Sequence, residues 1–119
     1  MAEPKEKKQE EKVQEAFTAT ADQIAEWKKK FGGVFAVEVV DDRNDNKKLR
    51  CYLKKPDRKI LHAAAAFGRQ NPMKFNETIF TNCWLAGDEE IKNDDYLRMS
   101  AEAQVGDMVQ IADATIKEL

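Results

Sequence analysis

The chain carries few side chains that could act as nucleophiles, general bases or metal ligands. His62 is its single histidine, Ser100 its single serine, and Cys51 and Cys83 are its two cysteines. A metal site needs several convergent N, S or O ligands, and these residues show no paired spacing. A nucleophile also needs a base beside it, and none is indicated here. The sequence therefore predicts no catalytic site, no metal and no cofactor, and we do not expect an enzyme.

The expected surroundings of these residues agree with this interpretation. His62 lies opposite Ile60 and Phe67 on a helical wheel, so we expect it to be exposed. Both cysteines fall on predicted apolar faces, where a thiol behaves as a small hydrophobe. Ser100 lies inside a predicted helix, without the strained turn that exposes a catalytic serine.

One loop partly matches a calcium-binding pattern. Asp42, Asn44 and Asn46 occupy the spacing of the first three ligands. The sixth position is then Lys47, where a glycine is needed, and the twelfth is Leu53, where a glutamate is needed. We interpret the segment as a polar hairpin turn.

The main candidate for a binding surface is a cluster of cations. Residues 41–59 carry eight Lys/Arg against four Asp/Glu, whereas residues 86–119 carry three against nine. Tyr52 is the one aromatic residue on the predicted solvent-facing side of this region, which is weak support for stacking on bases. The candidate partner-binding residues are Arg43, Lys47, Lys48, Arg50, Lys54, Lys55 and Arg58, with Lys59 beside them.

Bulk properties indicate one small domain. The chain has 119 residues, 35% of them charged, and a net charge of −2, which gives no overall bias toward nucleic acid or membrane. The longest apolar run, 63–67, is far too short to span a bilayer, and no signal peptide is visible. Two predicted buried thiols suit a reducing compartment, so we expect a cytoplasmic protein.

The pattern of residues predicts a hairpin within a set of helices. Residues 1–19 are predicted to be a charged, disordered tail, because balanced charge with few apolar residues cannot bury a core. A Thr20/Gln23 capping box then begins a helix that runs to Phe31. Residues 34–40 and 49–55 alternate as two strands around the polar loop 41–48.

The second half of the chain is predicted to be helical. Pro56 ends the second strand and Asp57 caps a helix over 58–70. A helix from residue 72 carries Phe80 and Trp84 as core anchors, and Ala86–Asp88 breaks it. Two further helices are expected, one from a cap at Asn93 or Asp94 to Gly106 and one over 108–119, with a strand at 108–112 as the alternative. The predicted fold class is α+β, a two-stranded antiparallel hairpin packed by four to five helices, forming one domain over 20–119.

Several short motifs follow one another in an order that resembles a known family. A helix ends in Trp-Lys-Lys-Lys-Phe-Gly-Gly (27–33), and Lys-Lys-Pro-Asp-Arg (54–58) joins a strand to an alanine-rich helix. Asn-Pro (71–72) begins a helix that ends in Asn-Cys-Trp-Leu-Ala-Gly-Asp (82–88). Over residues 24–119 the chain resembles the small tail-assembly chaperone and tail-completion proteins of tailed phages and prophages. The charged N-terminal tail departs from that family's pattern.

Two functions are therefore expected as alternatives. The resemblance implies a non-enzymatic, chaperone-like protein of phage or prophage tail assembly that binds another protein, possesses no catalytic residues and acts in the host cytoplasm. The alternative is a nucleic-acid-binding accessory protein that uses the basic hairpin 43–59. The sequence does not fix the oligomeric state or the identity of the partner.

Overall fold

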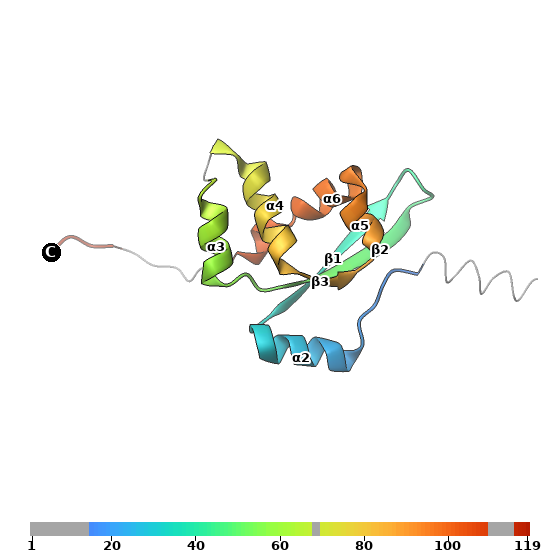
Figure 1. Cartoon of the computed structure of the whole chain (residues 1–119), viewed down its shortest axis with the longest axis horizontal. Coiled ribbons are helices and arrows are strands. Elements are labelled where there is room, and N and C mark those ends of the chain that lie inside the picture. Colours follow the sequence, from blue (N-terminus) through green and yellow to red (C-terminus); the bar gives the residue numbers. More distant parts are fainter. Residues whose placement is uncertain (1–14, 68–69, 110–115) are drawn as a thin grey trace, which may run out of the picture.

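A small antiparallel sheet carries most of the helices on one of its faces (Figure 1). The computed structural model describes residues 15–67, 70–109 and 116–119. The sheet order is β1-β2-β3, with β1 at Val34–Asp41, β2 at Lys47–Lys54 and β3 at Trp84–Gly87. The α+β class is confirmed, whereas the prediction of two strands is wrong by one strand.

Four of the described helices begin at residues that the sequence identifies as caps. The side chains of Thr20, Asp57, Asn71 and Asp94 each accept a hydrogen bond from a backbone N–H in the first turn of the helix that follows. The helices are α2 (Ala21–Phe31), α3 (Arg58–Ala65), α4 (Pro72–Cys83), α5 (Glu89–Asn93), α6 (Asp95–Glu102) and the 3₁₀ helix η2 (Val105–Met108).

Several helix ends differ from the prediction. Helix α3 ends at Ala65 instead of residue 70, and α6 ends at Glu102. Gly106 does not follow a long helix but lies inside η2. Half of the predicted final helix over 108–119, residues 110–115, lies outside the described residues, and residues 116–119 are not helical.

The hairpin of β1 and β2 forms as its alternation predicts. Val34 lies opposite Lys54, and Asp41 lies opposite Lys47. Asp45 and Asn46 adopt left-handed backbone angles (φ 52° and 54°), which Asp and Asn tolerate better than most residues. The loop therefore needs only residues 42–46, fewer than the eight predicted.

Strand β3 is the element that the sequence prediction missed. Helix α4 ends at Cys83, and three of the next four residues pair with β2: Gly87 lies opposite Cys51, Ala86 opposite Tyr52 and Trp84 opposite Leu53, with an irregularity at Leu85. A Cβ placed on Gly87 would lie 2.5 Å from the Cα of Cys51 and 2.8 Å from the carbonyl oxygen of Arg50. The glycine that was interpreted as a helix breaker is thus required for the close approach of β3 to β2.

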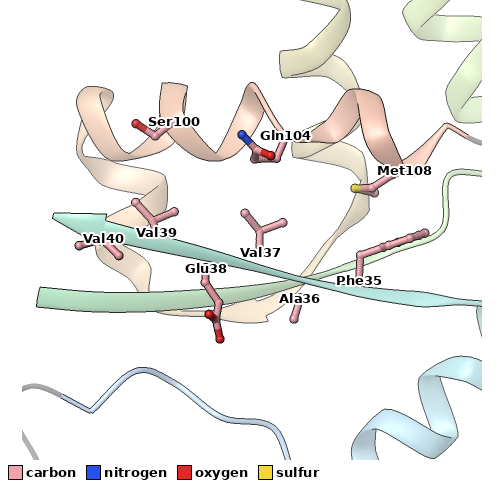
Figure 2. Close-up of a pocket in the computed structure, with 9 residues that line it drawn as sticks. All are labelled: Phe35, Ala36, Val37, Glu38, Val39, Val40, Ser100, Gln104 and Met108. Atoms are coloured by element: carbon pink, nitrogen blue, oxygen red, sulfur yellow. The ribbon is translucent and has the colours of Figure 1, made fainter. Parts of the chain in front are cut away.

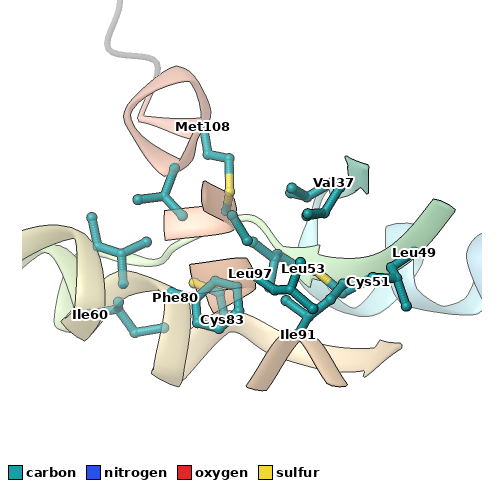
Figure 3. Close-up of a cluster of buried hydrophobic side chains, with 14 of the residues drawn as sticks. Val37, Leu49, Cys51, Leu53, Ile60, Phe80, Cys83, Ile91, Leu97 and Met108 are labelled. Atoms are coloured by element: carbon teal, nitrogen blue, oxygen red, sulfur yellow. The ribbon is translucent and has the colours of Figure 1, made fainter. Parts of the chain in front are cut away.

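The hydrophobic core lies between the sheet and the helical layer (Figure 3). Leu49, Cys51 and Leu53 of β2 project from one face and are at most 1% exposed. They meet buried side chains from all the covering helices, namely Ile60, Ala64, Ile79, Phe80, Cys83, Ile91, Leu97, Ala101, Val105 and Met108. Phe80, at 1% exposed, is confirmed as a core anchor. Trp84 is only half-buried and packs edge-on against the Phe80 ring from the rim, with 5.7 Å between ring centroids.

The N-terminal segment covers the opposite face of the sheet. Tyr52, predicted to face solvent, is 5% exposed because the rings of Phe17 and Trp27 pack against it at centroid distances of 6.1 and 5.8 Å. The N–H of Ala19 donates a hydrogen bond to the Tyr52 hydroxyl at 3.2 Å. Residues 16–19, assigned to the disordered tail, therefore belong to the folded unit. Residues 1–14 lie outside the described residues.

The glycine in β3 gives a first test of this architecture. We expect Gly87→Ala to lower the free energy of unfolding by about 2–3 kcal/mol, because backbone atoms block the added methyl group. Gly106→Ala is the matched control, since a Cβ there meets no atom within 4 Å. Chemical denaturation of both variants measures the difference, and equal stabilities would contradict the pairing of β3 with β2.

The two neighbouring aromatic residues give a second test. We expect Phe80→Ala to cost about 3–5 kcal/mol of unfolding free energy and Trp84→Ala about 2 kcal/mol, because only the phenylalanine is fully enclosed. The same denaturation experiment measures both. A larger loss for Trp84→Ala than for Phe80→Ala would place the tryptophan, not the phenylalanine, at the centre of the core.

Candidate protein-binding surfaces

Arg43, the first of the predicted partner-binding cations, is held inside the molecule's own network. Its Nε donates to Asp41 Oδ1 and a terminal nitrogen donates to Asp94 Oδ2, both at 3.0 Å. Its guanidinium carbon lies 4.3 Å from the centroid of the Tyr96 ring, a cation–π distance. The Tyr96 hydroxyl donates in turn to Asp42 Oδ1 at 3.0 Å. These contacts join the hairpin loop to the start of α6.

The same network shifts the proton affinities of its members. Hydrogen bonds from Arg43, and then from the backbone N–H of Leu97, lower the pKa of the Asp94 carboxyl, since both stabilise its charged form. The hydrogen bond to Asp42 raises the pKa of the Tyr96 hydroxyl, because ionisation would remove the donor. Hydrogen bonds to Asp41 and then Asp94 raise the pKa of Arg43.

Two more of the predicted cations also join elements of the fold. Lys47 Nζ lies 2.8 Å from Glu90 Oε1 and ties β2 to α5. The Arg50 guanidinium bonds Glu38 Oε2 at 2.6 Å and Thr18 Oγ1 at 2.7 Å. Arg43, Lys47 and Arg50 are therefore engaged within the chain, in the part that the structure describes.

The remaining four cations do not form one patch. Lys48, Lys54, Lys55 and Arg58 make no ion pair with another described residue. Lys48 and Lys54 are six positions apart along the strand, about 20 Å at the usual rise. The Lys54 ammonium lies 4.9 Å from the centroid of the Phe31 ring. With Tyr52 buried, the basic hairpin has lost the aromatic residue expected to stack on bases.

The cysteines, the serine and the histidine of the chain have different surroundings. Burial, and then the charge of Asp88, raises the pKa of the Cys51 thiol to about 12. Burial is also the main cause that raises the pKa of Cys83 to about 11. Both thiols are therefore protonated at neutral pH. Ser100 donates its hydroxyl to the Tyr96 carbonyl at 2.9 Å, and His62 is exposed on α3. No set of three potential metal ligands gathers among the described residues.

A groove between α4 and α6 was not predicted. It has a volume of about 390 Å³, and two exposed methionines, Met73 (60%) and Met99 (51%), lie along it. Arg98 is fixed in the groove by hydrogen bonds to Glu102 Oε2 and to Thr81 Oγ1, each 2.9 Å. The other lining residues are the acidic Glu77 and Asp95. We call this surface the methionine groove.

A second groove runs along the outer edge of the sheet (Figure 2). Strand β1 forms one wall and Ser100, Gln104 and Met108 of the α6–η2 segment form the other, around a volume of about 380 Å³. Figure 2 shows Val37 and Val39 pointing toward α6, whereas the side chains between them alternate to the other side of the sheet, as β-geometry requires. We call this surface the edge groove.

One signal in the sequence could have indicated the methionine groove. Met99 lies on the side of α6 opposite its buried residues Leu97 and Ala101, whereas Met73 lies seven residues before Phe80 on the apolar side of α4 and gives no such signal. An apolar residue outside the buried stripe of a helix stays exposed to solvent after the helix has packed. The edge groove has no comparable local signal, because it depends on which strand occupies the edge.

Comparison with models of known protein families, with curated proteins and with solved structures finds no match to this chain. None of the described helices has the length and apolar character needed to cross a membrane.

The Arg43 network gives a third testable prediction. We expect Arg43→Gln to raise the pKa of the Asp94 carboxyl toward its ordinary value, measured by NMR titration of the carboxyl carbon. The folded pKa of Asp94 is lowered, so its contribution to stability is present above the unfolded pKa and is lost as the pH falls through the folded pKa. Removing Arg43 should therefore weaken the fold at neutral pH more than in strong acid. Arg58→Gln is the control, and an unchanged Asp94 pKa in Arg43→Gln would contradict the network.

Proposed function

We propose that the protein is a non-enzymatic, chaperone-like component of phage or prophage tail assembly that acts in the host cytoplasm by binding a helical segment of another protein. The resemblance of residues 24–119 to small tail-assembly proteins supports the biological setting. The observation that carries the binding role is the methionine groove, in which Met73 and Met99 are 60% and 51% exposed.

Exposed methionines suit this role physically. The thioether side chain is unbranched and polarisable, so it adapts to irregular apolar partners. Two such side chains beside a groove between two helices offer anchors for the apolar face of a third helix. A chaperone that holds an aggregation-prone segment needs this kind of adaptable contact.

The charges of the groove indicate which helices it favours. Glu77, Asp95 and Glu102 line it together with a single cation, Arg98. Glu102 is engaged by Arg98, whereas the nearest cation to Glu77 is Lys74 at 3.5 Å. We therefore expect an amphipathic helix with Lys or Arg beside its apolar stripe. Such complementarity sets orientation and association rate more than affinity.

A second helical face offers a competing docking site. Ala63, Ala65 and Ala66 are exposed on and just after α3, whereas Ala64 is fully buried. Small side chains let another helix approach closely, but they supply little apolar area. A partner bound there should be sensitive to Ala63→Glu and insensitive to changes at Met99.

Binding to proteins encoded beside this gene tests the proposal. We expect Met99→Glu to raise the dissociation constant for the partner about ten-fold, because it places a charge at an apolar anchor. Ala25→Glu, at an exposed site on α2, is the matched control and should bind normally. High salt should weaken binding only modestly, since apolar contact supplies most of the affinity.

Two results would overturn the proposed function. One is the absence of any protein partner, combined with binding of single-stranded or duplex DNA that falls steeply with salt. Replacing Lys48, Lys54, Lys55 and Arg58 should then abolish that binding, and the nucleic-acid function would be preferred. The other is turnover of a substrate by the purified protein.

A further inference from the structure

Strand β1 presents an open edge to solvent. It pairs with β2 on one side, and no described residue pairs with its other side. Gly33 and Lys55 come next in the register, beyond Val34 and Lys54. The Lys55 N–H donates to the Gly33 carbonyl at 3.0 Å, so Gly33 and Lys55 form a hydrogen-bonded pair. Because hydrogen-bonded and non-hydrogen-bonded pairs alternate, the backbone groups of Val34, Ala36, Glu38 and Val40 must point away from β2.

The hydrogen bonds of β2 support this assignment independently. Arg50, the residue opposite Glu38, directs its N–H to the Asp88 carboxylate and its carbonyl to the Asp88 N–H, both at 2.9 Å. The backbone of Arg50 therefore faces β3. In a non-hydrogen-bonded antiparallel pair the partner faces the opposite way, so the backbone of Glu38 faces the open edge.

The open edge has little protection against pairing. Soluble proteins commonly guard such strands with charges, prolines, bulges or covering elements. The eight residues of β1 contain no proline, and its pairing with β2 is regular from end to end. Glu38 is the only charge before the final Asp41, and Val40 is 50% exposed. A strand of this kind is a template for another strand.

We infer that a second copy of this chain occupies the edge, with the two β1 strands pairing antiparallel about a two-fold axis at Val37. This register places Val34 opposite Val40 and Phe35 opposite Val39 of the other copy. Residues with outward backbone groups then pair with one another, as the ladder requires. The strand and its preceding Gly33 extend equally to both sides of Val37, so the whole length is used.

The side chains favour this register over the neighbouring one centred at Glu38. Residues that lie directly opposite each other in two antiparallel strands have their side chains on the same face of the sheet. The two-fold axis must therefore pass through one residue of β1 and not between two residues. An axis through Glu38 would place two like charges directly opposite, which is destabilising. With the axis at Val37, each Glu38 lies opposite Ala36 of the other copy. Figure 2 shows Ala36 and Glu38 on the side of the sheet away from α6, clear of the helical wall of the groove.

A charge-reversal cycle tests both the pairing and its register. Sedimentation velocity of the full chain over a range of concentrations should show a monomer–dimer equilibrium. Ala36→Glu places a carboxylate opposite Glu38 of the other copy twice per dimer, and we expect it to raise the dimer dissociation constant about ten-fold. Adding Glu38→Lys should restore dimerisation, because the two substituted positions then face each other across the axis with opposite charges.

Controls separate this effect from loss of folding. Ala25→Glu makes the same change at an exposed site on α2 and should leave the equilibrium unchanged. Glu38→Lys alone reports the cost of losing the Glu38–Arg50 ion pair, and circular dichroism monitors the fold of every variant.

Three outcomes would overturn the inference. A chain that stays monomeric at every concentration excludes the second copy. Slow hydrogen exchange at the Ala36, Glu38 and Val40 amides of a monomer would instead indicate that another part of the chain covers the edge. A dimer that ignores Ala36→Glu, or that the double variant fails to restore, would not use this register. None of these outcomes bears on the methionine groove, so the proposed function stands or falls separately.

Discussion

The fold depends on the corner where Asp88 meets Arg50. One oxygen of the Asp88 carboxylate accepts hydrogen bonds from the N–H groups of Arg50 at 2.9 Å and of Phe17 at 3.0 Å, and the Asp88 N–H donates to the Arg50 carbonyl. The Arg50 guanidinium then reaches Glu38 and Thr18. A single acidic residue thereby ends β3, fixes the middle strand and anchors the segment that covers the second face of the sheet. Asp88 precedes α5 but makes no side-chain cap there, because its carboxylate is used across the sheet.

Two ion pairs inside the molecule join the basic and the acidic parts of the chain. Arg43 pairs with Asp94 and Lys47 pairs with Glu90, so these ion pairs join the basic hairpin to the acidic last third of the chain. Individual exposed pairs contribute little stability. Their effect here is geometric, since they hold the hairpin loop against the α5–α6 junction. The described surface also carries two grooves that these ion pairs do not occupy.

Local rules in the sequence predicted the local structure well. The capping residues Thr20, Asp57, Asn71 and Asp94 and the alternation along β2 are confirmed, because a cap or a strand period needs only neighbouring residues. Apart from the helix ends, the errors concern burial and strand pairing, which depend on residues far apart in the sequence. Tyr52 was expected in solvent because the alternation of residues along β2 shows that the strand has two faces, but it does not show which segment covers the second face. Trp84–Gly87 was interpreted as a helix end because pairing with β2, some 30 residues earlier in the chain, leaves no local mark. An exposed methionine such as Met99 leaves a local signal in the sequence, but the shape of each groove does not, since each is formed by elements that become neighbours only in the fold.

Helix α6 links the two proposed surfaces. Its sequence divides into three stripes at helical spacing: Leu97 and Ala101 face the core, Arg98, Met99 and Glu102 line the methionine groove, and Ser100 lines the edge groove. A dimer formed through β1 would place two copies of α6 about one axis, and so would hold two methionine grooves at a fixed distance and orientation.

A long helical partner, or two neighbouring partner molecules, could then engage both grooves at once. The second contact would be intramolecular, so weak binding at each groove would suffice for a firm hold. Where the affinity of a single groove is low, a two-fold arrangement strengthens the binding without any new contact in the groove itself.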